Sequence, residues 1–233
     1  MVKALKFIDK EKKGSLNFNI SNRDRSIGAS VSGYIAEKYG ENGLKNTISL
    51  NFKGSAGQSF GCWNANNLNL TVDGDANDYV GKGMNGGRIV VKNESDYSKE
   101  NIETVLVGNT CLYGATGGEI YVSGSGGERF AVRNSGANAV IEGVGDHCCE
   151  YMTGGHVTIL GPVGGNFGAG MTGGFAYVLD EDRTFFDKCN RGLVNLERIT
   201  TEEMQPHRKH LKEILEKHYK YTKSNKAKEL LND

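Results

Sequence analysis

Glycines spaced as in a dinucleotide-binding loop are the first feature of this sequence that could support chemistry. Residues 81–86 (GKGMNG) match the pattern GxGxxG, and residues 168–173 (GAGMTG) match it a second time. Such glycines bind a pyrophosphate when they follow a strand and open a helix, whose N-terminus then faces the phosphate. The first motif instead runs into the strand-like residues 88–91 (RIVV). We therefore interpret both motifs as tight turns and expect this chain to bind no cofactor.

A calcium loop is a second possibility, because four oxygen-bearing side chains have its early spacing: Asp73, Asp75, Asn77 and Asp78. An EF-hand needs glycine at its sixth position and glutamate at its twelfth. The sequence has Asp78 and Met84 at these positions, so the EF-hand interpretation fails. We expect the four side chains to solvate a turn or to hydrogen-bond its backbone.

Soft metal ligands occur in sequence at His147, Cys148 and Cys149. If this stretch is a strand, adjacent side chains point to opposite faces and cannot all bind one ion. A tetrahedral site would then need further ligands from Cys62, Cys111, His156 or Cys189. We expect these residues to pack within the fold and expect no metal site.

Paired carboxylates could cleave glycosidic bonds, and Asp146 with Glu150, or Asp75 with Asp78, could form such pairs. Polysaccharide-binding proteins with a parallel β-helix, the fold that the internal repeat described below predicts, present platforms of several aromatic side chains. This chain has a single tryptophan, Trp63. No serine or cysteine lies in a nucleophile-elbow pattern. We expect these carboxylates to belong to turns and the surface, and we assign no catalytic residue.

The overall composition excludes several classes of partner. The 233 residues contain 28 Lys+Arg and 28 Asp+Glu, so no net charge attracts nucleic acid or anionic membranes. No apolar run is long enough to span a bilayer, and the first residues lack the apolar core of a signal peptide. The five cysteines form no CxxC pair, which fits a reducing compartment. We expect a soluble, cytoplasmic protein that binds neither nucleic acid nor membrane.

The elements that position these residues follow from an internal repeat. Four similar phrases begin at Ala115, Asn134, Met152 and Met171, and each runs from small or glycine residues into a β-branched, apolar stretch. Their period near 19 residues indicates a solenoid with one turn-and-strand unit per coil. Earlier copies begin at Lys45, Ala65 and Met84, with about 12 extra residues (94–105) before the next copy. The sequence therefore predicts a parallel β-helix of about seven coils, whose other sides are formed by short second segments such as 128–134 (ERFAVRN).

The two ends of the chain have different patterns, which predict a domain organisation of 1–44, 45–199 and 200–233. We expect an N-terminal cap (1–44), the parallel β-helix formed by the repeats (45–199), and a C-terminal helical tail (200–233).

Within the cap, we expect strands at 4–8 and 15–20, followed by a short amphipathic helix from Ser26 that stops at Gly40. In the tail, Thr200 and Glu203 have the spacing of a capping box. An apolar stripe then recurs at helical spacing, and a second short helix follows Ser224. We expect this stripe to pack on the solenoid or on a partner chain; it consists of Met204, Leu211, Ile214, Leu215 and His218.

Several long runs closely resemble the C-terminal GXGXG domain of the glutamate synthase large subunit. They are residues 54–61, 74–91, 127–155 and 166–182, and the flanks 22–40 and 216–231 resemble that domain too. The resemblance thus covers nearly the whole chain. Cys148 stands where this family more often has a small residue such as glycine, so the resemblance implies no ligand role for it.

This resemblance implies a right-handed parallel β-helix that performs no chemistry itself. It implies a stand-alone structural subunit of a glutamate synthase, scaffolding a glutamine amidotransferase, which releases ammonia, and an FMN-dependent synthase, where 2-oxoglutarate becomes glutamate. FMN and an iron–sulfur cluster are expected on those partner polypeptides. A homo-oligomer stays open, as do two alternatives: a scaffold like the β-helical subunit of formylmethanofuran dehydrogenase, and a scaffold of another amidotransferase complex.

Overall fold

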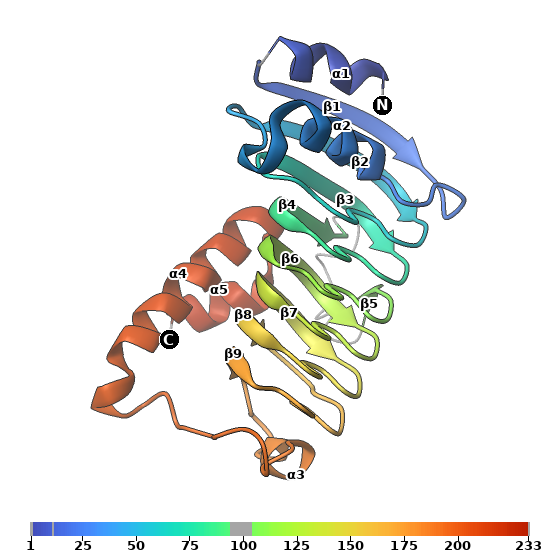
Figure 1. Ribbon diagram of the computed structural model, residues 1–233. Coiled ribbons are helices and arrows are strands. Elements are labelled where there is room, and N and C mark those ends of the chain that lie inside the picture. Colours follow the sequence, from blue (N-terminus) through green and yellow to red (C-terminus); the bar gives the residue numbers. More distant parts are fainter. Residues whose placement is uncertain (1, 11, 94–103, 233) are drawn as a thin grey trace.

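Parallel strands stacked in one sheet form the body of the molecule (Figure 1). The computed structural model describes residues 2–10, 12–93 and 104–232. The sheet has the order β1-β2-β3-β4-β6-β7-β8-β9, and β5 pairs with β3 and β6. The strands are β1 (Gly14–Ile20), β2 (Ile48–Ala56), β3 (Leu68–Ala76), β4 (Asn85–Lys92), β5 (Val105–Val107), β6 (Gly117–Gly126), β7 (Ser135–Val144), β8 (Thr153–Ile159) and β9 (Gly173–Val178).

The strands confirm the repeat, because each of the seven predicted copies contributes one strand, from β2 to β9 with β5 left out. In the sheet, Leu70 lies beside Ile89, which lies beside Ile120. The second of these steps is 12 residues longer, as the insertion before Ala115 predicts. Most of that insertion, residues 94–103, lies outside the described residues.

The main core lies between the sheet and a second layer formed by the short segments that follow each strand. Leu70, Ile89 and Ile120 face this core and are fully buried. The short second segments predicted between the strands form mainly turns in the described coils. We call the segments at 57–64, 77–84, 108–115, 127–134, 145–152 and 165–171 the turn layer. Its apolar side chains, such as Phe60 and Phe130, fill the core from the other side.

The N-terminal residues differ from prediction. Residues 2–9 form helix α1 (Val2–Asp9), so the strand predicted at 4–8 is wrong. Ala4 and Ile8, one helical turn apart, are both buried, and short apolar runs do not distinguish a helix from a strand. The predicted strand at 15–20 is confirmed as β1, but it joins the sheet beside β2. α1 packs beside β1 at the N-terminal end of the stacked strands (Figure 1).

Helix α2 (Ala29–Tyr39) confirms the helix predicted to stop at Gly40, which has a positive φ of 61° and donates its N–H to Ala36 O. The 3₁₀ turn η1 (Gly40–Asn42) follows it.

The C-terminal tail packs on the outer face of the sheet, as its apolar stripe predicts (Figure 1). It contains the 3₁₀ turn η3 (Glu202–Met204), α4 (Gln205–Thr222) and α5 (Asn225–Asn232). The short helix α3 (Phe185–Lys188) precedes the tail and lies at the C-terminal end of the solenoid (Figure 1). Ile214 and Leu215 of α4 join a second apolar cluster with Val90 and Val140 of the sheet. The predicted capping box is wrong, because Thr201 precedes η3 and no side chain caps η3 or α4.

Buried polar contacts lock the junction between the two tail helices. The Glu142 carboxylate on β7 accepts a hydrogen bond from Ser224 Oγ, and its Oε1 lies 3.3 Å from His218 Nε2. Ser224 Oγ also accepts the Ala227 N–H at 3.0 Å, which caps the start of α5. None of the helices in the described ranges is long and apolar enough to cross a membrane.

Candidate functional site

The turn layer has an unusual backbone that recurs in six coils. In each coil, three residues at alternate positions have φ between 53° and 69°, the left-handed region that glycine favours. The six triplets are Ser59, Gly61, Trp63; Tyr79, Gly81, Gly83; Thr110, Leu112, Gly114; Arg129, Ala131, Arg133; His147, Cys149, Tyr151; and Asn166, Gly168, Gly170. The two GxGxxG motifs therefore begin at equivalent places of two coils.

These residues join neighbouring coils through their backbone. The N–H groups of Tyr79 and Gly83 donate to Asn109 O and Tyr113 O of the following coil, each at 2.9 Å. The Gly81 N–H donates in the opposite direction, to Phe60 O of the preceding coil. These N–H groups are thus engaged by neighbouring coils, and the motif continues into β4 instead of opening a helix. The structure supports the interpretation of these glycines as turns, because the N–H groups that would hold a phosphate already have acceptors.

Large aromatic side chains stand on the outside of this layer. Trp63, Tyr151, Tyr79 and Tyr113 are exposed to 59%, 53%, 39% and 37%. At the positions equivalent to Trp63 and Tyr151, other coils have Gly83, Gly114 and Gly170. A bulky residue in a left-handed conformation costs roughly 1–3 kcal/mol, and such strain concentrates at functional sites. The rings of Trp63 and Tyr151 lie against Gly83 and Gly170 of the following coil but stay more than half exposed, which leaves a large aromatic surface for a contact outside this chain.

Cationic side chains lie between these rings. Lys82 Nζ is 5.4 Å from the centre of the Tyr79 ring and 5.8 Å from that of Tyr113. The Arg133 guanidinium is 5.7 Å from the Tyr151 ring. We call this set the aromatic ladder; it consists of Trp63, Tyr79, Lys82, Tyr113, Arg133 and Tyr151. Tryptophan, tyrosine and arginine are the residues enriched at the energetic centres of protein–protein interfaces.

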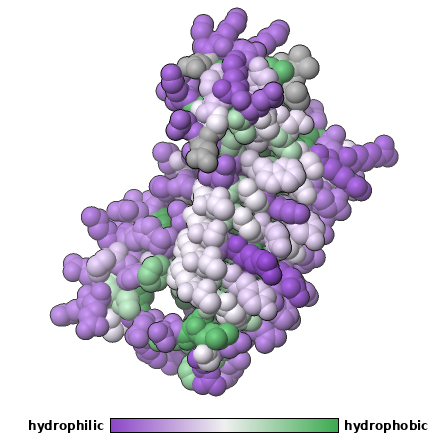
Figure 2. Space-filling view, viewed as in Figure 1, coloured by the Kyte–Doolittle hydropathy of each residue, from purple (hydrophilic) through white to green (hydrophobic). Residues whose placement is uncertain are grey.

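Figure 2 shows the face on which α2 lies, and a pale band of intermediate hydropathy extends along the solenoid there. Strongly hydrophilic side chains lie alongside this band (Figure 2). The glycines led us to this layer, but we assigned the aromatic residues no role from the sequence. Aligning the coils would have revealed them, because Trp63 and Tyr151 replace a repeated glycine.

The soft ligands His147, Cys148 and Cys149 lie in the turn layer and not on a strand, so that premise of the prediction is wrong. Cys148 and Cys149 are fully buried, with their Sγ atoms 3.7 Å apart. Cys149, one residue after Cys148, takes the left-handed position that glycine has in other coils. Burial raises the pKa of the Cys111 thiol to about 12, which disfavours the thiolate that metals require.

No three His, Cys, Asp or Glu side chains converge as a metal site within the part of the chain that the structure describes. All five cysteines are free and buried. They do not supply the convergent thiolates that an iron–sulfur cluster needs.

Part of the turn role expected of the acidic residues is wrong, because Asp73 and Asp75 lie on strand β3, where Asp75 accepts a hydrogen bond from Ser55 Oγ at 2.8 Å. Asp78 and Asp146 do have a turn role. Asp78 Oδ1 accepts the Asn109 N–H of the next coil at 2.8 Å, and Asp146 Oδ1 accepts the Gly165 N–H at 2.7 Å. Glu150, considered with Asp146 as a catalytic pair, forms a salt bridge with Arg129 at 2.8 Å. The two carboxylates thus have separate partners that hold coils together.

Comparisons with known proteins agree on one family. The family model described as the GXGXG motif matches residues 1–233. The chain is 53% identical over 214 residues to a ferredoxin-dependent glutamate synthase 2 of Synechocystis sp., covering 92% of this chain and 14% of that protein. It is 49% identical over 228 residues to the NADPH glutamate synthase large chain of Bacillus subtilis, covering 97% of this chain and 15% of that protein. This chain therefore spans about one seventh of the relatives that it matches.

Proposed function

Because this chain belongs to the GXGXG-motif family and matches one part of glutamate synthase large subunits, we propose that it is a non-catalytic structural part of a glutamate synthase. In this role it holds the glutamine amidotransferase part and the FMN-dependent synthase part together. The aromatic ladder is the surface on which at least one of them docks.

The observation that carries this proposal is the exposure of large aromatic rings at strained backbone positions. Trp63 and Tyr151 have left-handed backbones, are more than half exposed, and stand where equivalent coils have glycine. A contact with another protein would bury these rings, and the burial would offset the strain of their backbone positions. The adjoining Lys82 and Arg133 would pair with carboxylates of the partner, which favours correct orientation as the two surfaces meet.

We place the FMN and the iron–sulfur cluster on the other parts of the enzyme. The distribution of the cysteines over separate coils supports this for the cluster, since Cys62, Cys111 and Cys189 each pack into a different coil. For FMN, the support comes from the first glycine motif, in which the N–H groups of Gly81 and Gly83 donate to carbonyl oxygens of the neighbouring coils.

Replacing Trp63 with glycine separates docking from folding. Trp63→Gly removes an exposed ring and relieves a left-handed backbone, so we expect a thermal midpoint equal to or above that of the wild type. We expect its affinity for the partner polypeptides to fall at least about tenfold, as for the loss of an interface hot spot. Biolayer interferometry with the amidotransferase and FMN synthase polypeptides of the same organism measures this.

Trp63→Tyr is the matched control, because it keeps an aromatic ring on the same backbone and should retain most of the affinity. Wild-type affinity in Trp63→Gly would show that the ladder is not the docking face. Recovery of the chain from its source cells with a formylmethanofuran dehydrogenase or another complex, and without an amidotransferase or FMN protein, would overturn the proposed function.

A further inference from the structure

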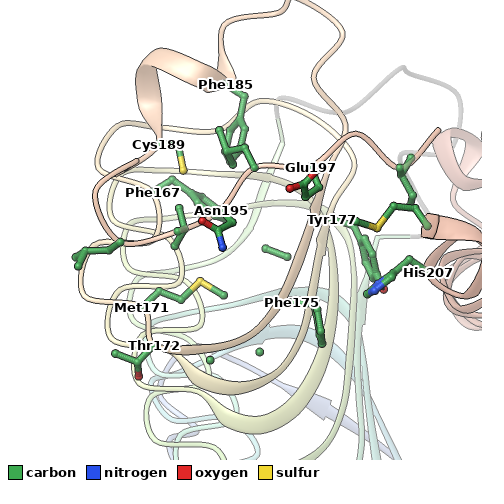
Figure 3. Close-up of a pocket in the computed structure, with 18 residues that line it drawn as sticks. Phe167, Met171, Thr172, Phe175, Tyr177, Phe185, Cys189, Asn195, Glu197 and His207 are labelled. Carbon is green, nitrogen blue, oxygen red and sulfur yellow. The ribbon is translucent and has the colours of Figure 1, made fainter. Parts of the chain in front are cut away.

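A hollow lies at the C-terminal end of the solenoid, beside the last strand (Figure 3). Its volume is about 420 Å³, within the range of sites that bind ligands. Phe167 and Met171 line it from the solenoid, and residues 193–199 cross it from the other side. Most of the lining is apolar, and several of the apolar side chains nearby are exposed: Phe175, Phe186, Leu193 and Leu196.

The hollow occupies the place of an unfinished coil. Residues 185–194 continue the turn layer by one further step, since the Phe167 N–H donates to Lys188 O and the Asn190 N–H donates to Phe167 O, each at 2.9 Å. Phe167 and Cys189 form an isolated parallel bridge. In the preceding coils a strand follows the turn layer, but after residue 194 the chain crosses toward α4 without adding one. This coil therefore has its turn layer and lacks its strand.

The edge of β9 is open to the missing strand. Within the described residues, β9 pairs with β8 alone, and no backbone hydrogen bond joins it to residues 193–199. The Leu179 N–H donates to Ile159 O at 3.0 Å, toward β8. Because N–H groups alternate in direction along a strand, those of Ala176 and Val178 point toward the open edge. The opposite edge of the sheet, at β1, is covered, because α1 packs beside β1.

We propose that an extended segment from another part of the glutamate synthase adds to the edge of β9, completes the unfinished coil and places apolar side chains in the hollow. This inference rests on the proposed function and names a second contact between the same partners. Strand addition of this kind gives affinity through main-chain hydrogen bonds and specificity through pockets for alternate side chains.

The length of the relatives and the covered edge of β1 both favour a segment of another part of the enzyme as the occupant of the β9 edge. The relatives are about seven times longer than this chain, so most of such an enzyme lies outside it. A second copy of this chain fits poorly as a stacking partner, because its β1 edge is covered by α1. The segment should alternate apolar with polar residues and should contain no proline at the positions that bond to β9.

Hydrogen exchange at single amides tests this proposal directly. In the isolated chain, the Ala176 and Val178 amides should exchange fast, whereas the Leu179 amide, bonded to β8, is protected. In the complex with the partner polypeptides, we expect exchange at Ala176 and Val178 to slow at least about tenfold. Residue-resolved mass spectrometry after quenched exchange provides the measurement.

Two variants extend the test to affinity. Ala176→Pro removes an N–H from the open edge, and proline is tolerated on that side of an edge strand. Leu196→Asp puts a charge at the mouth of the hollow on an exposed residue. Both should keep a thermal midpoint near that of the wild type and weaken binding at least about fivefold.

The possible outcomes are distinct. A complex that forms while the Ala176 and Val178 amides stay unprotected overturns the strand-addition proposal and leaves the proposed function standing. Protection that increases with the concentration of the chain alone, without a partner, also overturns it, because a second copy is then the occupant. Failure to form any complex overturns both proposals.

Discussion

Gly87→Ala is expected to lower the free energy of unfolding by at least about 2 kcal/mol. Gly87 has a φ of 67°, and a Cβ there would lie 2.2 Å from Leu68 O and 2.5 Å from Ala65 O. Both oxygens belong to the backbone of the neighbouring coil, so they cannot move aside as a flexible side chain could. Urea denaturation followed by circular dichroism measures the change.

Gly33→Ala is the matched control for this substitution. Gly33 lies within α2, and a Cβ there would meet no atom within 4 Å. Alanine also favours a helix over glycine, so stability should rise by about 0.5–1 kcal/mol. Equal destabilisation by the two variants would contradict close stacking of coils as the reason for glycine at residue 87.

Ser224→Ala is expected to release the C-terminal helices from the sheet. The substitution removes the donor to the buried Glu142 carboxylate and the acceptor for the Ala227 N–H. Loss of an N-cap costs about 1 kcal/mol, and the loss of a hydrogen bond to the buried Glu142 carboxylate costs about 1–3 kcal/mol even though His218 Nε2 stays 3.3 Å from it. We expect a total loss of about 2–4 kcal/mol and faster proteolytic cleavage within residues 195–204. Limited proteolysis and urea denaturation together measure these effects.

Thr200→Ala serves as the control here. The sequence suggested Thr200 as a helix cap, but the structure gives η3 and α4 no side-chain cap. We expect its stability to stay within about 0.5 kcal/mol of the wild type. A loss as large as that of Ser224→Ala would argue that the capping box forms after all.

The sheet could be predicted from the sequence because its strands obey a repeat. Leu70, Ile89 and Ile120 occupy equivalent places in the phrase and adjacent places in the sheet. The C-terminal helices could be predicted for a similar reason, because Ile214 and Leu215 belong to an apolar stripe at helical spacing. In both cases a periodic apolar face determines what is buried.

The left-handed backbone of the turn layer could not be predicted in the same way. Glycine marks it at residues 81, 83, 168 and 170, but Ala131, Arg133 and Cys149 have the same conformation without any glycine. In those coils, hydrogen bonds with both neighbours impose the conformation against local preference. Propensity describes single residues, whereas the neighbouring coils decide this geometry.

The contacts between rings and cations in the aromatic ladder became visible only in three dimensions. Tyr79 and Tyr113 come from successive coils, and Lys82 lies near both rings only because the coils stack. The open edge of β9 depends on where the chain leaves the solenoid after residue 194. Neither the ring–cation contacts nor the open edge has a sequence motif of its own.

If this chain brings the two other parts of a glutamate synthase together, it should control the glutamine-dependent rate of glutamate formation. The amidotransferase and FMN synthase polypeptides of the same organism would be assayed with and without this chain, using glutamine or free ammonia as the nitrogen source. Addition of the chain should raise the glutamine-dependent rate several-fold relative to the ammonia-dependent rate, and Trp63→Gly should raise it much less. An equal glutamine-dependent rate with and without the chain would contradict the scaffolding role.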